Sequence, residues 1–313
     1  MANPYSQTQI NPQLQKIICC PKDKSNLIIN DDQKVLFCEI CKENYFIKES
    51  VPILLSKEII EQNNNSIPSN NENHAFSNTK KAHEKIPTGY QVKQLKSKSK
   101  IKRFWNFHKF TKIQKYLPKE GKILDIGCGS GAFESLKNTL NLQNTKIIGL
   151  DITPKQVIFA QQNHKESLFV AGSGHELPFK DNSFDAVVLI EFIEHIPKNA
   201  IQKLLKEAKR VLKDNGKIII TTPNYQSPYL LIEWLHSKFG KVNYSEQHIT
   251  HFTPKRMRKA LKIAGFNKLK ITTTYGIAPF LAPISKKLAL KTLKNEPITE
   301  FGCRLKLISI ASK

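Results

Sequence analysis

Hydrophobic positions change their spacing along the chain, and the changes divide it into segments. Residues 16–57 hold two short apolar stretches, LIIN and KVLFCEI, separated by the turn-like Asn30-Asp31-Asp32, which predicts a small β-rich module. Residues 61–80 are rich in Asn and Ser with almost no periodicity, as is typical of a linker. Between Val92 and Leu117, apolar residues recur at the spacing of an amphipathic helix. We therefore predict a tail over 1–15, a module over 16–57, a linker over 58–90 and a main domain over 91–313.

From Lys122 onward, apolar strands alternate with amphipathic helices. The pattern predicts strands at KILDIGCG, KIIGLDI, SLFVAG, FDAVVLI and KIIITTP. It predicts helices after Gly131, over Pro154–Asn163 and over Ala200–Leu212, then a helix over 254–264 and strands over 266–274 and 304–311. Strands of continuous Ile, Val and Leu alternating with helices indicate an α/β fold with a parallel sheet covered on both faces.

Composition narrows the class of protein. The chain has 313 residues, of which 40% are hydrophobic, which is enough apolar surface to exclude wholesale disorder. Every apolar run is shorter than the roughly 18 residues that would span a bilayer. The first residues, MANPYSQTQINPQ, lack the basic and apolar regions of a signal peptide. We expect a soluble, cytoplasmic protein.

Charge is distributed unevenly. The net charge of +23 divides into 0 for residues 1–60, +9 for 61–117, −2 for 118–200 and +16 for 201–313. A slightly acidic middle between basic flanks suggests that the middle handles a cationic or hydroxyl-bearing group, while the flanks meet something anionic. The alternative is a general bias of the sequence toward lysine.

A glycine-rich turn, Asp125-Ile126-Gly127-Cys128-Gly129-Ser130-Gly131, follows the first strand of the main domain. Asp151 ends the second strand, where a carboxylate can accept hydrogen bonds from both ribose hydroxyls of a nucleoside. The spacing is G-x-G-x-G, which differs from the G-x-G-x-x-G of dinucleotide sites. Asp125 would repel a pyrophosphate but suit an ammonium or sulfonium group. The preferred ligand is therefore a nucleoside that carries a positive charge.

Residues 120–223 resemble the class I S-adenosylmethionine-dependent methyltransferase family, through ILDIGCGSGAF, IIGLDI, GSGHELPFKDNSFDAVVL and EAKRVLKDNGKIIITTPN. The resemblance implies a Rossmann-like, seven-stranded sheet whose last strand is antiparallel, and S-adenosylmethionine as the cofactor. It implies that three glycines line the methionine moiety, that Asp151 holds the ribose, and that residues 173–175 flank the adenine. Where the family often has Asp, this chain has Ser173. The predicted cofactor-binding set is Asp125, Gly127, Gly129, Gly131, Asp151, Ile152, Ser173, Gly174, His175 and Ile190.

A second cluster of chemistry-bearing residues follows the FDAVVLI strand, at the strand end where such folds bind ligands. In Glu191-Phe192-Ile193-Glu194-His195, a helical turn would place the two carboxylates and the imidazole on one face. His248 and His251 appear later, and the whole set suits Mg²⁺, Mn²⁺ or Zn²⁺. A bound metal could ionise a substrate hydroxyl, as it does coordinated water.

E-x-x-E-H followed by a later His resembles two branches of the family, the 2′-O-methyltransferases of small-RNA 3′ ends and the O-methyltransferases of ubiquinone biosynthesis. That resemblance implies the metal ligands Glu191, Glu194, His195 and His248, with His251 as an alternative to His248. In the competing interpretation, His195 is a general base without a metal. Glu191 and His195 are the predicted catalytic residues, and a non-catalytic role is the third interpretation.

The N-terminal cysteines have a spacing close to that of a zinc ribbon. Cys38 and Cys41 form an intact C-x-x-C, whereas Asp23 stands where the first knuckle, with Cys20, would need its second cysteine. The predicted zinc ligands are Cys20, Asp23, Cys38 and Cys41, with Cys19 as an alternative to Asp23. The segment resembles the small zinc-ribbon family whose members activate RNA and protein methyltransferases. A metal-free hydrophobic hairpin is the alternative.

These observations predict a methyltransferase enzyme that methylates oxygen on a small, lipid-linked or sugar-linked metabolite. The first alternative is an RNA methyltransferase of the 2′-O type that uses the basic flanks, and the second is a non-catalytic module that binds the cofactor or a partner. Residues 279–294, PFLAPISKKLALKTLK, mix apolar and lysine positions as an interfacial helix does, which suggests peripheral membrane contact.

Overall fold

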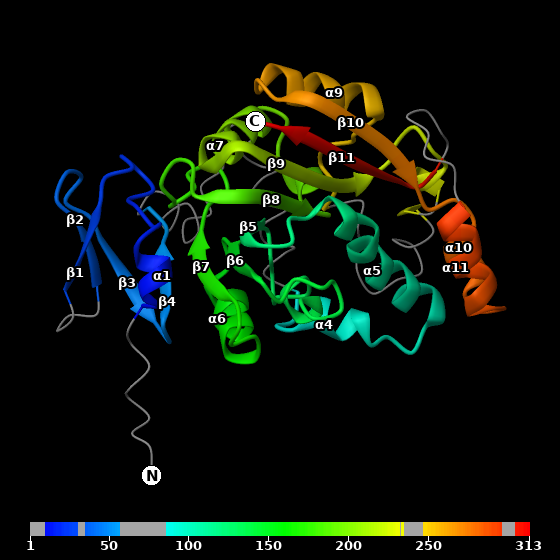
Figure 1. The fold of residues 1–313 in the computed structure, drawn as a ribbon, viewed down its shortest axis with the longest axis horizontal. Coiled ribbons are helices and arrows are strands. Elements are labelled where there is room, and N and C mark those ends of the chain that lie inside the picture. Colours follow the sequence, from blue (N-terminus) through cyan, green and yellow to red (C-terminus); the bar gives the residue numbers. More distant parts are fainter. Residues whose placement is uncertain (1–9, 31–34, 57–85, 232, 235–246, 296–303) are drawn as a thin grey trace, which may run out of the picture.

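One mixed β-sheet of eleven strands runs through the protein (Figure 1). The structure, a computed structural model, describes residues 10–30, 35–56, 86–231, 233–234, 247–295 and 304–313. Most of the linker predicted over 58–90 therefore lies outside the described residues. The strand order is β1-β2-β3-β4-β7-β6-β5-β8-β9-β11-β10.

Seven neighbouring strands of this sheet match the strands that the apolar pattern predicts. They are β5 (Gly121–Ile126), β6 (Thr145–Asp151), β7 (Leu168–Gly172), β8 (Phe184–Ile190), β9 (Leu212–Pro223), β10 (Asn267–Thr274) and β11 (Lys306–Ser312). The first five pair in parallel, and β11 runs antiparallel to both β9 and β10. The antiparallel last strand agrees with the expectation drawn from the family resemblance.

The N-terminal segment adds four strands, so the prediction of a seven-stranded sheet gave too low a number. Helix α1 (Pro12–Gln15) precedes an antiparallel meander of β1 (Leu27–Asn30), β2 (Val35–Cys38), β3 (Asn44–Lys48) and β4 (Val51–Leu54). Strand β4 pairs in parallel with β7, with Ile53 opposite Ala171. The segment is β-rich, as predicted, but its strands continue the main sheet and do not form a separate one.

Helices cover both faces of the sheet. Helices α7 (Ile201–Val211) and α9 (Pro254–Ile263) pack on one face, and their apolar residues share a core with Leu124, Ile126 and the N-terminal segment. Helix α5 (Lys100–Ile113) packs on the other face, where Ile123 points because side chains alternate along a strand. Helix α6 (Pro154–Asn163) lies against β7 on that second face. The sheet is therefore buried on both sides, as the continuous apolar strands predict.

Short helices at one end of the sheet complete the fold. Helices α10 (Ala278–Leu281) and α11 (Lys286–Asn295) lie at the end opposite the N-terminal strands (Figure 1). They pack on α5 through a cluster that includes Phe104, Tyr275 and Leu293. Among the described helices, none has both the length and the apolar character that crossing a bilayer requires.

Two predicted helices differ from the structure. The segment after Gly131 forms turns and the 3-10 turn Glu134–Leu136, and a continuing helix is excluded at Asn141, which has a left-handed φ of 54°. The helix predicted between Val92 and Leu117 is divided into α4 (Tyr90–Leu95) and α5. The Ser99 side chain accepts a hydrogen bond from the Lys102 amide at 3.4 Å and begins α5 as an N-cap.

Candidate functional site

The glycine turn after β5 has a backbone that only glycine adopts easily. Gly127, Gly129 and Gly131 all have left-handed φ angles, of 81°, 54° and 84°. The Gly127 amide donates to the Leu150 carbonyl at 2.8 Å, which holds the turn against the end of β6. A Cβ atom on Gly127 would lie 2.2 Å from the ring of Phe192. The left-handed φ angles and the close approach of Phe192 therefore both require glycine in this turn.

Asp151 braces this turn. Its Oδ2 accepts a hydrogen bond from the Gly129 amide at 3.0 Å, and its Oδ1 accepts one from the Thr153 amide at 2.9 Å. A carboxylate oxygen can accept more than one hydrogen bond, so Asp151 can hold the turn and also receive a ligand hydroxyl. Asp151, the residue predicted to bind the ribose, thus lies beside the predicted glycine turn.

The other predicted cofactor residues lie at neighbouring strand ends. Ile152 and Ile190 are half-buried at the ends of β6 and β8. Ser173 is buried, and its Oγ accepts a hydrogen bond from the His175 amide at 3.2 Å. Burial lowers the pKa of His175 to about 4, so its ring is neutral at physiological pH. A Cβ atom on Gly174 would lie 3.2 Å from Ile126, which ends β5.

Asp125 gives the turn a buried acidic group. Burial and, to a smaller extent, the nearby Asp151 carboxylate raise its pKa to about 8, against the opposing effect of Lys109. Burial likewise lowers the pKa of the Lys109 ammonium to about 8, while Glu194 and Asp125 favour its charged form. A cationic ligand beside Asp125 would favour the carboxylate. These features fit a cofactor that carries a positively charged sulfonium.

Gln91 of α4 is a neighbour of the turn that the sequence did not reveal. The Ser130 hydroxyl donates to Gln91 Oε1 at 2.8 Å, and a Cβ on Gly129 would lie 2.8 Å from Gln91 Nε2. Helix α4 therefore lies over the turn. A single glutamine in a lysine-rich segment carries no signal that would have singled it out.

Three of the predicted metal ligands come together at the end of β8. Glu194, His195 and His248 each offer one ligand atom, and these atoms lie within 4.8 Å of one another. Glu194 Oε2 accepts a hydrogen bond from the Thr222 hydroxyl at 2.9 Å. Among the residues that the structure describes, the buried Glu194 Oε1 has no hydrogen-bond partner. An orphaned carboxylate oxygen beside two imidazoles fits a divalent cation.

The two rings are oriented by hydrogen bonds at Nδ1. His195 Nδ1 lies 2.9 Å from the Gln247 carbonyl oxygen, and His248 Nδ1 lies 2.5 Å from Glu233 Oε1. Because a carbonyl or carboxylate accepts only, Nδ1 carries the proton and Nε2 carries the lone pair in each neutral ring. The Tyr225 hydroxyl also donates to Glu233. A carboxylate behind a histidine is the usual support of a metal ligand.

Glu191 and His251 lie outside this group. Glu191 has a left-handed φ of 55°, forms an ion pair with Lys306 and accepts a hydrogen bond from the Thr221 hydroxyl at 2.8 Å. His251 stacks on the Tyr225 ring with the centroids 4.0 Å apart. The geometry thus groups His248, and not His251, with Glu194 and His195, while a metal contact of Glu191 stays a prediction.

Lys306 and Glu233 are site residues that the sequence analysis missed. Lys306 is 2% exposed at its side chain and lies 5.0 Å above the Trp105 ring, beside Glu191. A lone lysine inside the apolar strand predicted over 304–311 was a signal that could have been noticed. Glu233 had no such signal, since it lies in a segment without a clear pattern.

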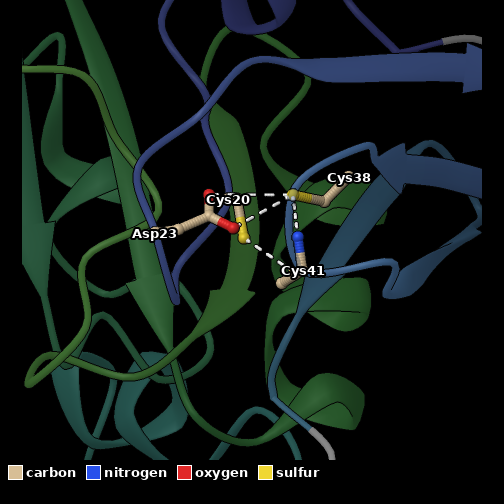
Figure 2. Close-up of side chains that lie close together, drawn as sticks. All are labelled: Cys20, Asp23, Cys38 and Cys41. Atoms are coloured by element: carbon tan, nitrogen blue, oxygen red, sulfur yellow. Dashed lines mark hydrogen bonds between the residues drawn. The ribbon is translucent and has the colours of Figure 1, made fainter.

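The four predicted zinc ligands lie together in the N-terminal segment, as Figure 2 shows. Their ligand atoms are all within 4.8 Å of one another, and they come from the segment before β1, the end of β2 and the turn after it. Cys20 Sγ lies 3.6 Å from Cys41 Sγ, and Cys38 Sγ lies 3.2 Å from Asp23 Oδ2. The grouping fits one tetrahedral metal ion.

Hydrogen bonds fix Asp23, and not Cys19, in this group. The Ser25 amide and hydroxyl donate to Asp23 Oδ1 at 2.9 and 2.5 Å. Burial raises the pKa of Asp23, but these hydrogen bonds outweigh that effect and hold its pKa well below the usual range. Cys19 is buried outside the group, and burial raises its thiol pKa to about 11.

Comparison with known proteins agrees with the geometry of the turn. A family model described as a methyltransferase domain matches residues 124–220. An uncharacterised protein of Methanocaldococcus jannaschii is 32% identical over 165 residues, covering 52% of this chain and 72% of the relative. Demethylmenaquinone methyltransferase of Staphylococcus haemolyticus is 27% identical over 190 residues, covering 54% and 79%. The chain spans only 59% of the length of a second M. jannaschii relative, which is 31% identical over 52% of this chain.

A solved structure extends the similarity to the fold. A S-adenosylmethionine-dependent methyltransferase of Thermotoga maritima superimposes with a TM-score of 0.50 at 25% identity, covering 68% of this chain and 91% of the other. The matched family region runs from β5 to β9, which includes the glycine turn, Asp151 and the Glu194-His195 segment.

Proposed function

Because this chain belongs to the class I S-adenosylmethionine-dependent methyltransferase family, we propose that it methylates a hydroxyl oxygen of a small, lipid-linked or sugar-linked metabolite. The glycine turn, Asp151 and Asp125 would hold the cofactor. In the reaction the acceptor hydroxyl loses its proton, its oxygen attacks the methyl carbon, and the carbon–sulfur bond breaks with its electrons going to sulfur. The products are a methyl ether, S-adenosylhomocysteine and a proton.

One observation carries the choice of oxygen as the acceptor. An aliphatic hydroxyl is a poor nucleophile at neutral pH, so its methylation needs a group that removes or weakens its proton. Glu194, with its orphaned Oε1, and the imidazoles of His195 and His248 offer a ligand set for a divalent ion at that place. When bound, such an ion lowers the pKa of a coordinated hydroxyl.

The chain's own residues have separate tasks in this proposal. Glu233 keeps the His248 proton on Nδ1, and the Gln247 carbonyl does the same for His195. The ring of Phe192, which lies against Gly127, connects the Glu-His segment to the cofactor turn. Lys306 holds the Glu191 carboxylate at the edge of the site. In this proposal, these contacts would hold the Glu-His group and the glycine turn in fixed positions, so that an acceptor oxygen could meet the methyl group.

We further propose a structural zinc ion at Cys20, Asp23, Cys38 and Cys41. Three thiolates and a carboxylate would repel one another without a cation, and Zn²⁺ prefers sulfur ligands in tetrahedral sites. Because β2 leads into the meander that joins the main sheet at β4, loss of this ion would loosen the N-terminal edge of the fold.

Methyl transfer from labelled cofactor to cell extracts, fractionated into RNA, lipids and small molecules, tests the proposal. Label in the lipid or small-molecule fraction that disappears with EDTA and with His248→Ala supports it. Label that is indifferent to chelator would assign proton removal to His195 Nε2 alone and refute the catalytic metal. Label confined to RNA would favour the alternative acceptor, which the cationic helix α9 keeps open.

A further inference from the structure

A row of large apolar side chains lies exposed along the segment that contains α10 and α11. Ile277 directly precedes α10, Phe280 lies in α10, Ile284 lies in the turns between the two helices and Leu288 lies in α11, so the four side chains recur along one short segment. Ile284 is 80% exposed and Ile277 is 64% exposed. The Ile284 and Ser285 amides both donate to the Leu281 carbonyl, so hydrogen-bonded turns connect the end of α10 to the start of α11.

The inward side of the same segment is already filled. Ala278, Ala282, Ala289 and Leu293 are buried in the cluster that packs on Phe104 of α5. Lys112 Nζ donates to the Leu293 carbonyl at 2.5 Å and ties the end of α11 to α5. The exposed row therefore lies outside this buried cluster, although Phe280 and Leu288, each 46% exposed, are partly covered by the protein.

Charge around the row has a single sign. Lys286, Lys287, Lys291 and Lys294 are exposed on α11, and residues 277–295 contain no Asp or Glu. Lys287 and Lys291 stand on either side of Leu288 in α11, so cationic and apolar side chains share this exposed segment. An aliphatic row flanked by lysines matches a surface with an apolar interior and anionic headgroups.

We propose that the α10–α11 segment docks on an anionic membrane surface, with the side chains of Ile277, Phe280, Ile284 and Leu288 entering the headgroup region. This inference rests on the proposed function for its purpose, because a lipid-linked acceptor would be presented from that surface. RNA is the less suitable occupant, since the row is mainly aliphatic and offers a single aromatic side chain for base stacking.

Contacts connect this surface to the Glu-His group. Tyr229 packs against the α10–α11 cluster, and the next residues in the chain, Leu230 and Leu231, are exposed. The Tyr229 ring meets the Tyr225 ring edge-on at 5.6 Å, and Tyr225 donates to Glu233 behind His248. A membrane-bound α10–α11 segment would therefore lie one layer of aromatic side chains from the group that we place at the reaction centre.

Vesicle sedimentation with the purified full chain tests the inference. Vesicles of phosphatidylcholine and phosphatidylglycerol in equal parts should bind the protein, and pure phosphatidylcholine vesicles should bind it more weakly. The double variant Phe280→Ser, Ile284→Ser should lose about tenfold or more of its partition coefficient, because two large side chains no longer enter the bilayer. Lys287→Ser with Lys291→Ser should reduce binding to the anionic vesicles alone.

Ile263→Ser is the matched control, since Ile263 is equally an exposed isoleucine but ends α9 on a different helix. Equal binding by the wild type and the Phe280→Ser, Ile284→Ser variant, or an equal loss in the control, would overturn the inference. Tighter binding to a single-stranded RNA oligonucleotide than to anionic vesicles, lost in the same double variant, would overturn it in favour of RNA. Cofactor binding is measured separately, in solution and without vesicles, and tests the proposed enzyme. The membrane proposal and the proposed function can therefore fail independently of each other.

Discussion

The carboxylate behind His248 provides the sharpest test of the catalytic metal. Glu233 Oε1 lies 2.5 Å from His248 Nδ1, and the side chains are 4% and 5% exposed, so the pair is shielded from water. In Glu233→Gln, the amide oxygen can still accept this hydrogen bond, and Tyr225 can still donate, but the negative charge is gone. The imidazole then becomes a weaker donor of its Nε2 lone pair to a metal.

Loss of such a supporting carboxylate typically weakens metal binding about 10- to 100-fold. That range corresponds to about 1.4 to 2.7 kcal/mol of binding free energy. We expect Glu233→Gln to fall in this range, and His248→Ala, which removes a ligand itself, to lose more. Competition between the metal-free protein and a fluorescent indicator for Mn²⁺ or Zn²⁺ measures both dissociation constants.

Glu176→Gln is the matched control, because Glu176 also pairs with a basic side chain, Lys203 at 2.8 Å, but does not belong to the group of Glu194, His195 and His248. Its metal affinity should equal that of the wild type, and urea unfolding should show that all three variants remain folded. The reasoning is refuted if Glu233→Gln binds metal as tightly as the wild type, or if Glu176→Gln loses as much.

Three further changes test the cofactor turn and the cysteine group. Gly127→Ala should lower S-adenosylmethionine affinity by about tenfold or more, because the new Cβ would lie 2.2 Å from the Phe192 ring and the residue would keep a left-handed φ. Titration calorimetry measures this affinity. In the control, Gly265→Ala, the φ is also left-handed but the Cβ would face the flexible end of Lys209, so only the stability should fall. Because burial raises the pKa of Asp125 to about 8, the folded state keeps a proton that the unfolded chain releases, so the stability of the cofactor-free protein should fall as pH rises from about 4 to about 8. Affinity for the cationic cofactor should rise over the upper part of that range, and unaltered slopes in Asp125→Asn would contradict this assignment. Cys38→Ser should lose the zinc that atomic absorption detects and unfold at lower urea, whereas Cys19→Ser, a buried cysteine outside the group, should keep the metal.

The part of the fold that the sequence predicts is the part fixed by local pattern. Apolar runs set β8 and α6 at their observed bounds, because a buried parallel strand and an amphipathic helix each leave a distinct periodicity. The segment after Gly131 has apolar residues but also Asn138 and Asn141, which favour turns over a helix. The segment is also short, so its apolar spacing alone could not distinguish a helix from a series of turns.

Local sequence patterns could not predict contacts between segments that are far apart in the chain. The pairing of Ile53 with Ala171 extends the sheet to eleven strands, and nothing in either strand alone indicates its partner. The cysteine group was predicted because its spacing encodes a known geometry, and the structure assembles all four residues. Glu233 and Lys306 reach the site through folding alone, so only the structure connects them with His248 and Glu191.

The parallel pairing of β4 with β7 has a consequence for how the chain is made. Strand β4 leaves the ribosome long before β7, so the first-synthesised meander must wait, with one edge open, until its neighbour arrives. An open strand edge is a template for pairing with other chains. Truncation that removes residues 1–56 would leave β7 as an open edge of the finished sheet, and we expect the folded protein to self-associate through that edge.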